Sequence, residues 1–278
     1  MIAIFGSNGY LGKAISSVTN LEIIKFTHKC ESDDEIFFDL NNYSLNLKKS
    51  LFEKISIAII CIGKGNLEYC AQNKQTTWNF NVRDISNLIT LLNDLKVKII
   101  YLSSDAVFQG ITGNYTELDI RRPVLTYGLQ KKYIEDYIIA KVDNYLIVRL
   151  SKVYDFNHKN SFIKKWEEYL NNGNDLNILN DYLFTPIYKE DVVKILLFLI
   201  YNSCEGIFHI SGPITTTYVE IFKMFIKKFD ISKSKSKIQF INRSQLNLSE
   251  AFPRNLSLNS SKLTSIYPTE IKSIFDIL

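Results

Sequence analysis

A tyrosine and a lysine in this sequence have the types and the spacing of an acid–base pair. Tyr127 and Lys131 lie four residues apart in a stretch with helical character, so both side chains fall on one face of a helix. A tyrosine phenol ordinarily keeps its proton up to a pKa of about 10. A nearby ammonium favours the phenolate and lowers that pKa, which would let Tyr127 exchange a proton with a carbonyl oxygen.

A short polar segment could supply a hydrogen bond for that chemistry. Ser103, Ser104 and Asp105 follow an apolar run at 97–102, which predicts a buried strand. The carboxyl ends of parallel strands are where α/β sheets place their ligands. The Ser104 hydroxyl can therefore orient a substrate oxygen. The plainer interpretation is that Ser104 only caps a turn.

Glycines at positions 6, 9 and 12 are a third feature with a chemical role. They follow the apolar strand Ile2–Phe5 directly and open a helix predicted at 11–18. Gly6 permits a tight turn, Gly9 lets a pyrophosphate approach the backbone, and Gly12 lets the helix pack closely on the sheet. The helix N-terminus adds N–H groups and a partial positive charge. This strand–turn–helix context favours a dinucleotide site over a glycine-rich turn that binds nothing.

The end of the second predicted strand, at 21–26, bears on the choice of cofactor. An acidic residue there would bind a ribose 2′-hydroxyl and indicate NAD. The chain instead has Thr27, His28 and Lys29, and hydroxyls with cations suit a 2′-phosphate better. NADP is therefore predicted, with NAD as the alternative. Asp39 either approaches the adenine or is a plain surface carboxylate.

Apolar strands alternate with amphipathic helices through the first half of the chain. Besides the elements above, strands are predicted at 55–62 and 145–150, and helices at 84–95 and 127–140. After residue 154 the pattern loosens, with helices predicted at 162–170, 190–201 and 218–229 and a strand at 206–210. The alternation predicts an α/β fold of the Rossmann type, a doubly wound parallel sheet with helices on both faces, and a small C-terminal α/β substrate domain. The first domain would comprise residues 1–154 and 187–211, and the substrate domain residues 155–186 and 212–278.

The composition limits the class of protein. Of the 278 residues 46% are hydrophobic, and 33 Lys and Arg oppose 29 Asp and Glu, which gives a net charge of +4. A nucleic-acid partner would require a dense basic stripe. The nearest feature is diluted with serine and is interpreted as a solvated loop: Lys227, Lys228, Lys233, Lys235 and Lys237. The longest apolar run, at 192–201, is about half a membrane span, so neither nucleic acid nor membrane is expected as a partner.

Cysteine and histidine usage argues against disulfides and metals. Four scattered cysteines lack Cys-x-x-Cys spacing, and the three histidines lie near none of them in a ligand pattern. The first residues show neither the basic region nor the cleavage site of a signal peptide. We therefore expect no disulfide framework, no metal and a cytoplasmic location.

Nine segments of the chain resemble motifs of the extended short-chain dehydrogenase/reductase family, and within it the sugar-nucleotide reductases related to dTDP-4-dehydrorhamnose reductase. They are residues 6–12, 38–40, 79–82, 103–108, 127–131, 148–154, 185–186, 215–218 and 255–263. The resemblance implies a Rossmann domain, a small C-terminal domain and a nucleotide sugar bound between them. It also implies a triad of Ser104, Tyr127 and Lys131, with Tyr127 as proton donor and Lys131 also holding the nicotinamide ribose.

The resemblance adds further residues to the predicted site. Those expected at the cofactor, besides Tyr127 and Lys131, are Gly6, Asn8, Gly9, Tyr10, Leu11, Gly12, His28, Lys29, Asp39, Leu40, Cys61, Ile62, Gly63, Asn81 and Ser103. Those expected at the substrate are Ser104, Asp105, Val107, Tyr127, Lys152 and Arg254. Lys152 stands where the reductases carry a tryptophan, and Arg254 one place after their arginine. These two cations either meet a diphosphate or an acidic sugar, or are ordinary exposed charges.

These features predict an NADP-dependent reductase that turns the 4-keto group of a nucleotide-activated (deoxy)sugar into an alcohol, a step of deoxysugar or polysaccharide biosynthesis. An epimerase of the same family and a non-enzymatic NADP-binding regulatory subunit remain alternatives. A dehydratase would carry an Asp-Glu pair after the catalytic hydroxyl, whereas Ser104 is followed by Asp105 and Ala106. By analogy with the family, the helices at 84–95 and 127–140 could form a homodimer interface.

Overall fold

A seven-stranded parallel sheet forms the centre of the protein. The structure, a computed structural model, describes residues 1–18, 22–41, 49–158, 161–229 and 236–278. The strand order is β11-β6-β5-β4-β1-β2-β3, and every neighbouring pair is parallel. The strands are β1 (Ile2–Phe5), β2 (Ile23–Thr27), β3 (Glu35–Phe37), β4 (Ile57–Ile60), β5 (Lys98–Ser104), β6 (Tyr145–Leu150) and β11 (Gly206–Ile210). The predicted Rossmann-type sheet is confirmed, and β3 is an edge strand that the apolar pattern did not predict.

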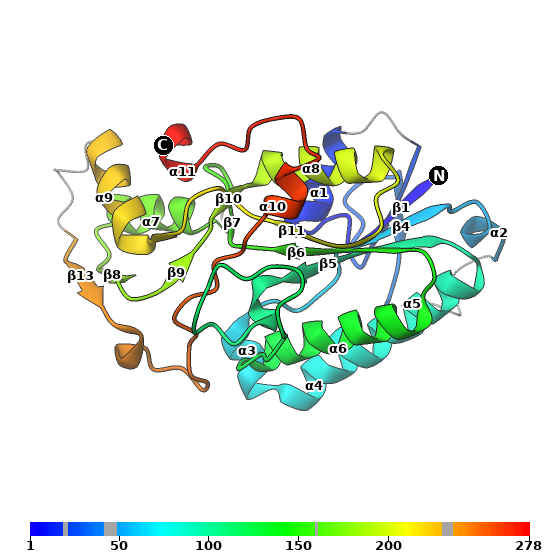
Figure 1. Cartoon of the computed structure of the whole chain (residues 1–278), viewed down its shortest axis with the longest axis horizontal. Helices are drawn as coiled ribbons and strands as arrows, with labels where there is room; N and C mark the ends of the chain where they lie inside the picture. Colours follow the sequence, from blue (N-terminus) through cyan, green and yellow to red (C-terminus); the bar gives the residue numbers. More distant parts are fainter. Residues whose placement is uncertain (19–21, 42–48, 159–160, 230–235) are drawn as a thin grey trace.

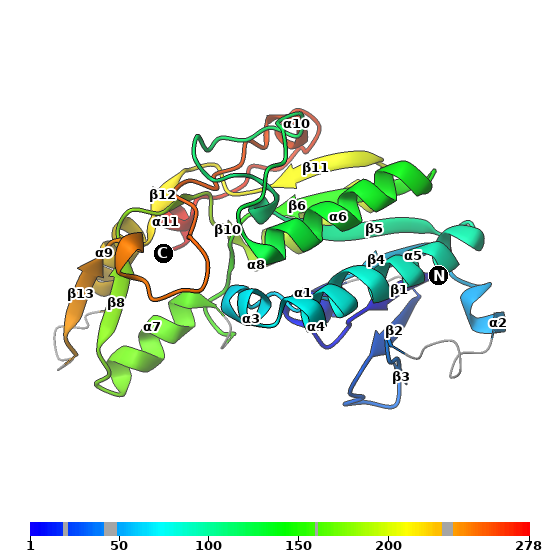
Figure 2. The same cartoon turned by 90° about the horizontal axis from the view of Figure 1, so that it is seen from below.

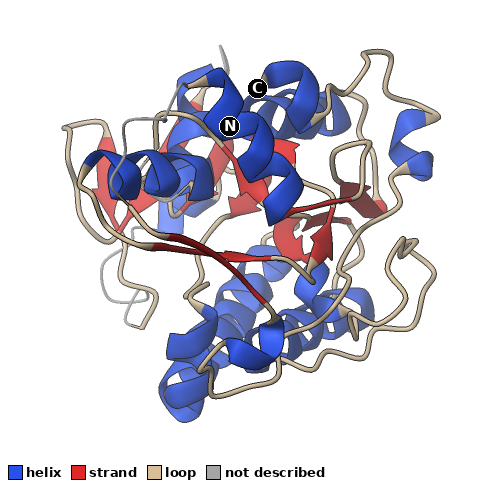
Figure 3. Cartoon of the chain, turned by 90° about the vertical axis from the view of Figure 1, so that its left-hand side faces the viewer, coloured by secondary structure: helices blue, strands red, loops and turns tan. Residues whose placement is uncertain are grey.

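Helices cover both faces of this sheet (Figure 3). α1 (Tyr10–Val18) and α8 (Lys189–Tyr201) pack on one face, and α5 (Ile85–Asp94) and α6 (Thr126–Lys141) pack on the other (Figure 1). β1 is buried at all four positions, which explains its uninterrupted apolar run. Shorter helices complete this part: α2 (Lys49–Phe52), α3 (Leu67–Gln72), α4 (Lys74–Trp78) and a π-helix (Asn79–Asp84) that leads into α5.

A second apolar core lies at the end of the molecule opposite β2, β3 and α2 (Figure 2). It is formed by α7 (Phe162–Asn171), β8 (Leu176–Leu179), α9 (Tyr218–Lys228) and α11 (Ile274–Ile277), and β13 (Ile238–Ile241) lies beside β8. β8 and β13 pair in parallel, and neither strand was predicted. Two-residue strands connect the parts: β7 (Val153–Tyr154) with β10 (Ile187–Tyr188), and β9 (Leu183–Phe184) with β12 (Thr216–Thr217). α10 (Ser261–Thr264) packs near β11. The division into two domains with the predicted bounds stays a prediction.

Two observations complete the outline of the described residues. No helix among them is both long and apolar enough to cross a membrane. Of the lysine-rich stretch, Lys227 and Lys228 end α9 and Lys237 precedes β13, whereas Lys233 and Lys235 lie outside the described residues.

Candidate active site

Three glycines shape the turn between β1 and α1. The backbone of Gly6 has a φ of +90°, a conformation that favours glycine. A Cβ atom on Gly12 would lie 2.1 Å from the Gly6 carbonyl oxygen, so α1 packs against the turn only because residue 12 has no side chain. At Gly9 the corresponding distance is 3.1 Å. The turn thus brings bare backbone to the N-terminus of α1, the arrangement that a pyrophosphate needs.

A cavity of about 490 Å³ opens beside this turn. Its walls are Gly6, Gly9, Phe26, Thr27, His28, Phe38, Leu40, Asn41, Cys61, Ile62, Gly63, Lys64 and Phe80. Apolar rings with a few polar groups are typical of a small-molecule site. The glycine turn and this cavity together fit a dinucleotide cofactor.

The loop after β2 contains the residues predicted to select the cofactor. His28 lines the cavity. Lys29 is exposed, and its backbone carbonyl accepts a 2.6 Å hydrogen bond from Asn8 Nδ2. Asn8 therefore ties the glycine turn to this loop. Asp39 lies outside the cavity wall and accepts a 3.0 Å hydrogen bond from the Asn41 backbone.

α6 brings Tyr127 and Lys131 to the end of β5. Lys131 Nζ lies 5.8 Å from the centre of the Tyr127 ring and donates a 2.8 Å hydrogen bond to the Leu102 carbonyl. The first turn of α6 can approach the short turn that follows β5 only because residue 128 is glycine. A Cβ atom on Gly128 would lie 2.0 Å from the Ala106 carbonyl oxygen. The predicted pair therefore shares one helix face, held close to the end of a central strand.

Burial changes the proton affinities of this pair in opposite directions. It raises the pKa of Tyr127 well above its ordinary value, with smaller contributions from Asp105 and Cys70. It lowers the pKa of Lys131 to about 8, while Glu135 acts in the opposite direction. The expected lowering of the Tyr127 pKa is therefore wrong, because loss of hydration on burial is the largest contribution and raises it. Tyr127 therefore keeps its proton to a higher pH than an exposed phenol does.

Ser104 ends β5 and faces a second cavity together with Tyr127. Its Oγ donates a 2.9 Å hydrogen bond to Asp105 Oδ1 and accepts one of 3.2 Å from the Ala106 N–H. The turn cap is therefore present, and the same hydroxyl also lines the cavity. Burial raises the pKa of Asp105 to about 6, although the Ser104 hydrogen bond and the Lys152 charge oppose the rise.

This second cavity, of about 310 Å³, lies between the carboxyl ends of β5 and β6 and the second core. The Lys152 side chain is exposed to the cavity. The walls around it displace part of its hydration, which lowers its pKa, and the Asp105 carboxylate has the opposite effect. The Tyr10 hydroxyl is buried with no hydrogen-bond partner among the described residues. The full wall is Tyr10, Gly65, Leu67, Ser103, Ser104, Asp105, Ala106, Leu125, Tyr127, Leu150, Ser151, Lys152, Val153, Tyr182, Tyr218, Phe252, Pro253 and Leu256.

Two predicted substrate residues are not brought to this cavity. Val107 is fully buried, because the short turn after Ser104 directs its side chain into the second core. Arg254 is exposed and lies outside the cavity wall. Its neighbour Pro253 does line the cavity, so the chain leaves the wall at residue 254.

Several residues predicted at the cofactor contact other parts of the protein instead of the cofactor cavity. Asn81 is buried, and its side chain accepts a 2.8 Å hydrogen bond from the Lys64 N–H and donates one of 3.0 Å to the Lys64 carbonyl. It therefore fixes the loop after β4. Leu11 packs against the core under α1, and Tyr10 lines the second cavity. The Ser103 hydroxyl donates a 2.5 Å hydrogen bond to Glu135 Oε1.

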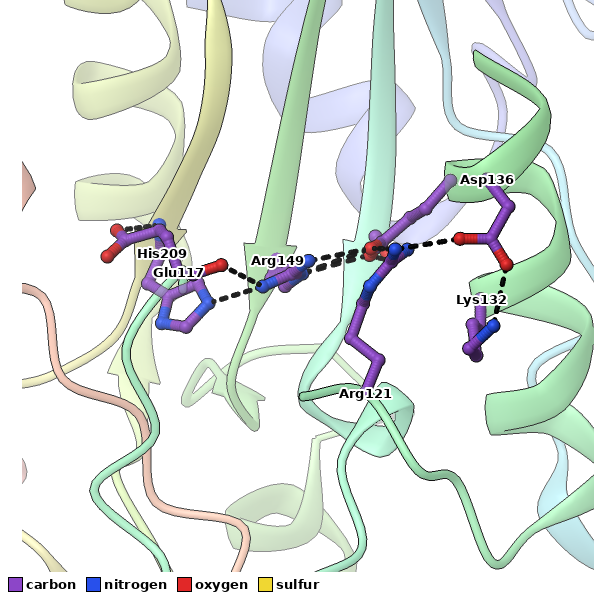
Figure 4. A network of polar contacts seen from close by, with 8 residues as sticks. Glu117, Arg121, Lys132, Asp136, Arg149 and His209 are labelled. Atoms are coloured by element: carbon purple, nitrogen blue, oxygen red, sulfur yellow. Dashed lines mark hydrogen bonds and ion pairs between the residues drawn. The ribbon is translucent and has the colours of Figure 1, made fainter. Parts of the chain in front are cut away.

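A buried network of charges lies directly behind the site. Glu135, one turn after Lys131 on α6, accepts hydrogen bonds from Arg149 Nη2 at 2.8 Å and Arg121 Nη1 at 3.0 Å, besides that from Ser103. Figure 4 shows the contacts continuing to further members: Glu117, His209, Asp136 and Lys132. Since Ser103 lies on β5 and Arg149 on β6, the network joins two central strands to the helix that carries Tyr127 and Lys131.

Some wall residues were outside the predicted set. Tyr218 and Phe80 carried a signal, since they lie in the matched segments 215–218 and 79–82. Tyr182 and Phe252 had no local pattern, because only the folding of the second core brings them to the cavity.

Comparison with known proteins finds a matching family and several relatives. The model of a family described as the RmlD substrate binding domain matches residues 1–274. The dTDP-4-dehydrorhamnose reductase of Sinorhizobium fredii is 28% identical over 178 residues, which are 61% of this chain and 60% of that protein. A dTDP-4-dehydrorhamnose reductase of Aggregatibacter actinomycetemcomitans is 22% identical over 76% of this chain and 73% of its own length. A probable low-salt glycan biosynthesis reductase of Haloferax volcanii is 25% identical over 59% and 56%. The first alignment thus spans less than two thirds of that relative's length.

Solved structures share the fold. A hypothetical dTDP-4-dehydrorhamnose reductase from Sulfolobus tokodaii superposes with a TM-score of 0.85 at 23% identity, covering 97% of this chain and 96% of that chain. The dTDP-4-dehydrorhamnose reductase of Bacillus anthracis in complex with NADP gives a TM-score of 0.85 at 21% identity, covering 99% and 95%. The architecture described above is therefore shared over nearly the whole chain.

Proposed function

The chain belongs to the RmlD substrate binding domain family, and we propose that it is an NADP-dependent reductase of the keto group of a nucleotide-activated sugar. One observation carries the proposal: Tyr127 and Ser104 face one cavity, with Lys131 beside the tyrosine and a dinucleotide-sized cavity nearby. The reductase names of the relatives above support the same reaction class.

The chemistry assigned to each side chain follows from its surroundings. A bound reduced nicotinamide would supply a hydride to the carbonyl carbon and be oxidised in doing so. Tyr127, which keeps its proton because burial raises its pKa, gives that proton to the carbonyl oxygen, so that an alcohol forms. Lys131 stabilises the resulting phenolate until solvent restores the proton. Ser104 donates a hydrogen bond to the same oxygen once its hydroxyl turns away from Asp105.

The two cavities would divide the ligands between them. The glycine turn and the larger cavity would hold the cofactor, with His28 beside a 2′-phosphate and Lys131 at the nicotinamide ribose. That the Bacillus anthracis structure is a complex with NADP supports this choice of cofactor. In the other cavity the rings of Tyr218 and Phe252 would pack on the nucleotide sugar, and Lys152 would face an acidic group of it.

The test is NADPH oxidation by the purified protein with a 4-keto-6-deoxy nucleotide sugar. Tyr127→Phe should lower kcat about 10²–10⁴-fold, because the proton donor is lost. Tyr133→Phe is the matched control, since Tyr133 lies on the exposed side of the same helix and should leave kcat unchanged.

Other outcomes would support other functions. Tight NADPH binding without turnover on a broad panel of keto nucleotide sugars would contradict the reductase and favour a regulatory subunit. Interconversion of two epimers without net NADPH consumption would favour an epimerase. A higher kcat/KM with NADH than with NADPH would contradict the cofactor assignment alone.

A further inference from the structure

The helix that carries Tyr127 is capped by a residue from far along the chain. α6 begins at Thr126. The residue before it is Leu125, whose apolar side chain cannot accept a hydrogen bond from a backbone N–H. Glu250, 124 residues away, does so instead. Its Oε2 accepts a 2.8 Å hydrogen bond from the Thr126 N–H, and its Oε1 accepts one from the Thr126 hydroxyl. A carboxylate here accepts a hydrogen bond from an N–H group that has no partner within the helix, and it is attracted by the positive end of the helix dipole.

Glu250 belongs to a segment, residues 246–253, that we call the strap. The Glu250 side chain is 14% exposed, and Lys74 Nζ lies 3.5 Å from Glu250 Oε1. The preceding residue makes a separate contact with α3. Ser249 N–H and Oγ donate to Glu68 at 3.1 and 2.5 Å. Figure 1 shows the strap (orange) running from β13 to the vicinity of α3. The strap is thus held at two places, one on α3 and one on α6.

The strap also forms part of the wall of the 310 Å³ cavity. Phe252 and Pro253 line it together with Tyr127. Beyond the strap, the Arg254 and Asn255 N–H groups donate to the Gly110 carbonyl at 2.8 and 2.9 Å, which fixes its end. A ligand that packs on Phe252 therefore contacts the same segment that caps α6.

We propose that Glu250 is a positioning residue that fixes the first turn of α6 and thereby the Tyr127 hydroxyl. Tyr127 directly follows Thr126, so fraying of this turn moves the proton donor itself. Displacement of a reacting group by about 1 Å can cost about 10²-fold in rate. Docking of the strap and orientation of Tyr127 are therefore coupled through one carboxylate. The kinetic part of this inference rests on the proposed reductase function, and the structural part does not.

Kinetics separate this role from that of a simple contact. Glu250→Ala should lower kcat for the keto nucleotide sugar about tenfold or more. Glu250→Gln keeps one acceptor oxygen and should lose only about threefold, and Thr126→Val, which keeps the N–H, should behave similarly. Glu68→Gln is the control, because it loosens the strap on α3 without touching α6. It should raise KM and leave kcat unchanged.

Amide hydrogen exchange gives a readout independent of turnover. The Leu129 N–H donates to the Leu125 carbonyl at 2.9 Å and closes the first turn of α6. Glu250→Ala should speed its exchange about 5–10-fold, and Glu68→Gln should not. Unchanged Leu129 exchange, with the same rise in KM and unchanged kcat in both variants, would overturn the proposal. If the unaltered protein shows no turnover, the reductase function fails, and Leu129 exchange alone decides whether Glu250 fixes the turn.

Discussion

Lys131 sets the expected pH dependence of the site. Loss of hydration lowers its pKa to about 8, and the nearby Glu135 carboxylate limits the fall. Below that pH the ammonium form that stabilises the Tyr127 phenolate is complete, and above it this form is lost. We predict that kcat/KM for reduction falls as the pH rises through about 8. Tyr127 does not contribute, since its pKa lies well above this range.

An arginine separates the titration of Lys131 from other causes. A guanidinium stays protonated to a pKa above about 12. Lys131→Arg should therefore lose the alkaline decline even where its rate is lower. Lys132→Arg, on the outer side of α6 where Lys132 pairs with Asp136, should keep the original profile. An alkaline decline that persists in Lys131→Arg would show that another group is responsible.

At the scale of elements, the Glu135–Arg149 pair should be the main polar support of β5, β6 and α6. The two side chains are 0% and 1% exposed, and removal of one partner leaves the other charge buried. Glu135→Ala should lower the free energy of unfolding by about 3–5 kcal/mol in urea titrations. Glu167→Ala is the control, because its pair with Lys164 on α7 is part-exposed and should contribute less than about 1 kcal/mol. Equal losses in the two variants would contradict a supporting role.

The elements that the sequence predicts best are those buried on both faces. β6 and β11 have the predicted bounds, because a strand covered by helices or loops on both faces is apolar at successive positions. β13 carries no such pattern, since it is largely exposed and its partner among the described strands is β8, about 60 residues earlier. The expected strand at 55–62 is shorter, because its last residues turn into the cofactor cavity.

The same limit applies to the site. Local motifs predict the centre of the candidate site: the glycine turn, Ser104 and the Tyr127–Lys131 pair all belong to a strand end or a helix start. The cavity wall formed by the second core and the Glu250 cap depend on contacts between residues more than a hundred positions apart. No spacing of residue types in the sequence predicts such contacts. Asn81 illustrates a further difficulty, since a polar residue near a cofactor can serve the backbone of its neighbours.

At the scale of the whole molecule, the chain leaves the sheet after β6 and returns to complete it. β11 pairs with β6 over five residues. α8 covers the same face as α1, and Leu196 and Leu199 of α8 are fully buried there. The sheet is therefore finished only after α7 and β8 of the second core have been passed. This connectivity underlies the prediction that residues 187–211 belong with residues 1–154.

A chain that ends at Tyr154 should fail to fold cooperatively. It lacks α8 and β11, so apolar side chains such as Ile4, Ile59 and Ile100, which are 0% exposed in the complete protein, lose their cover. We expect binding of a hydrophobic dye, association in size-exclusion chromatography and no sharp thermal transition. A soluble monomer with a cooperative transition would contradict the prediction.

A rejoined chain distinguishes loss of α8 and β11 from loss of the second core. Residues 187–211 joined to Tyr154 through a short Gly-Ser linker should regain a cooperative transition. The linker is geometrically feasible, because Val153 and Ile187 are partners in the parallel β7–β10 pair and neighbouring strands lie about 4.8 Å apart. Both chains lack the second core, so any difference between them belongs to the returning segment. If the rejoined chain also fails, the sheet depends on the second core, and the division into two domains is wrong.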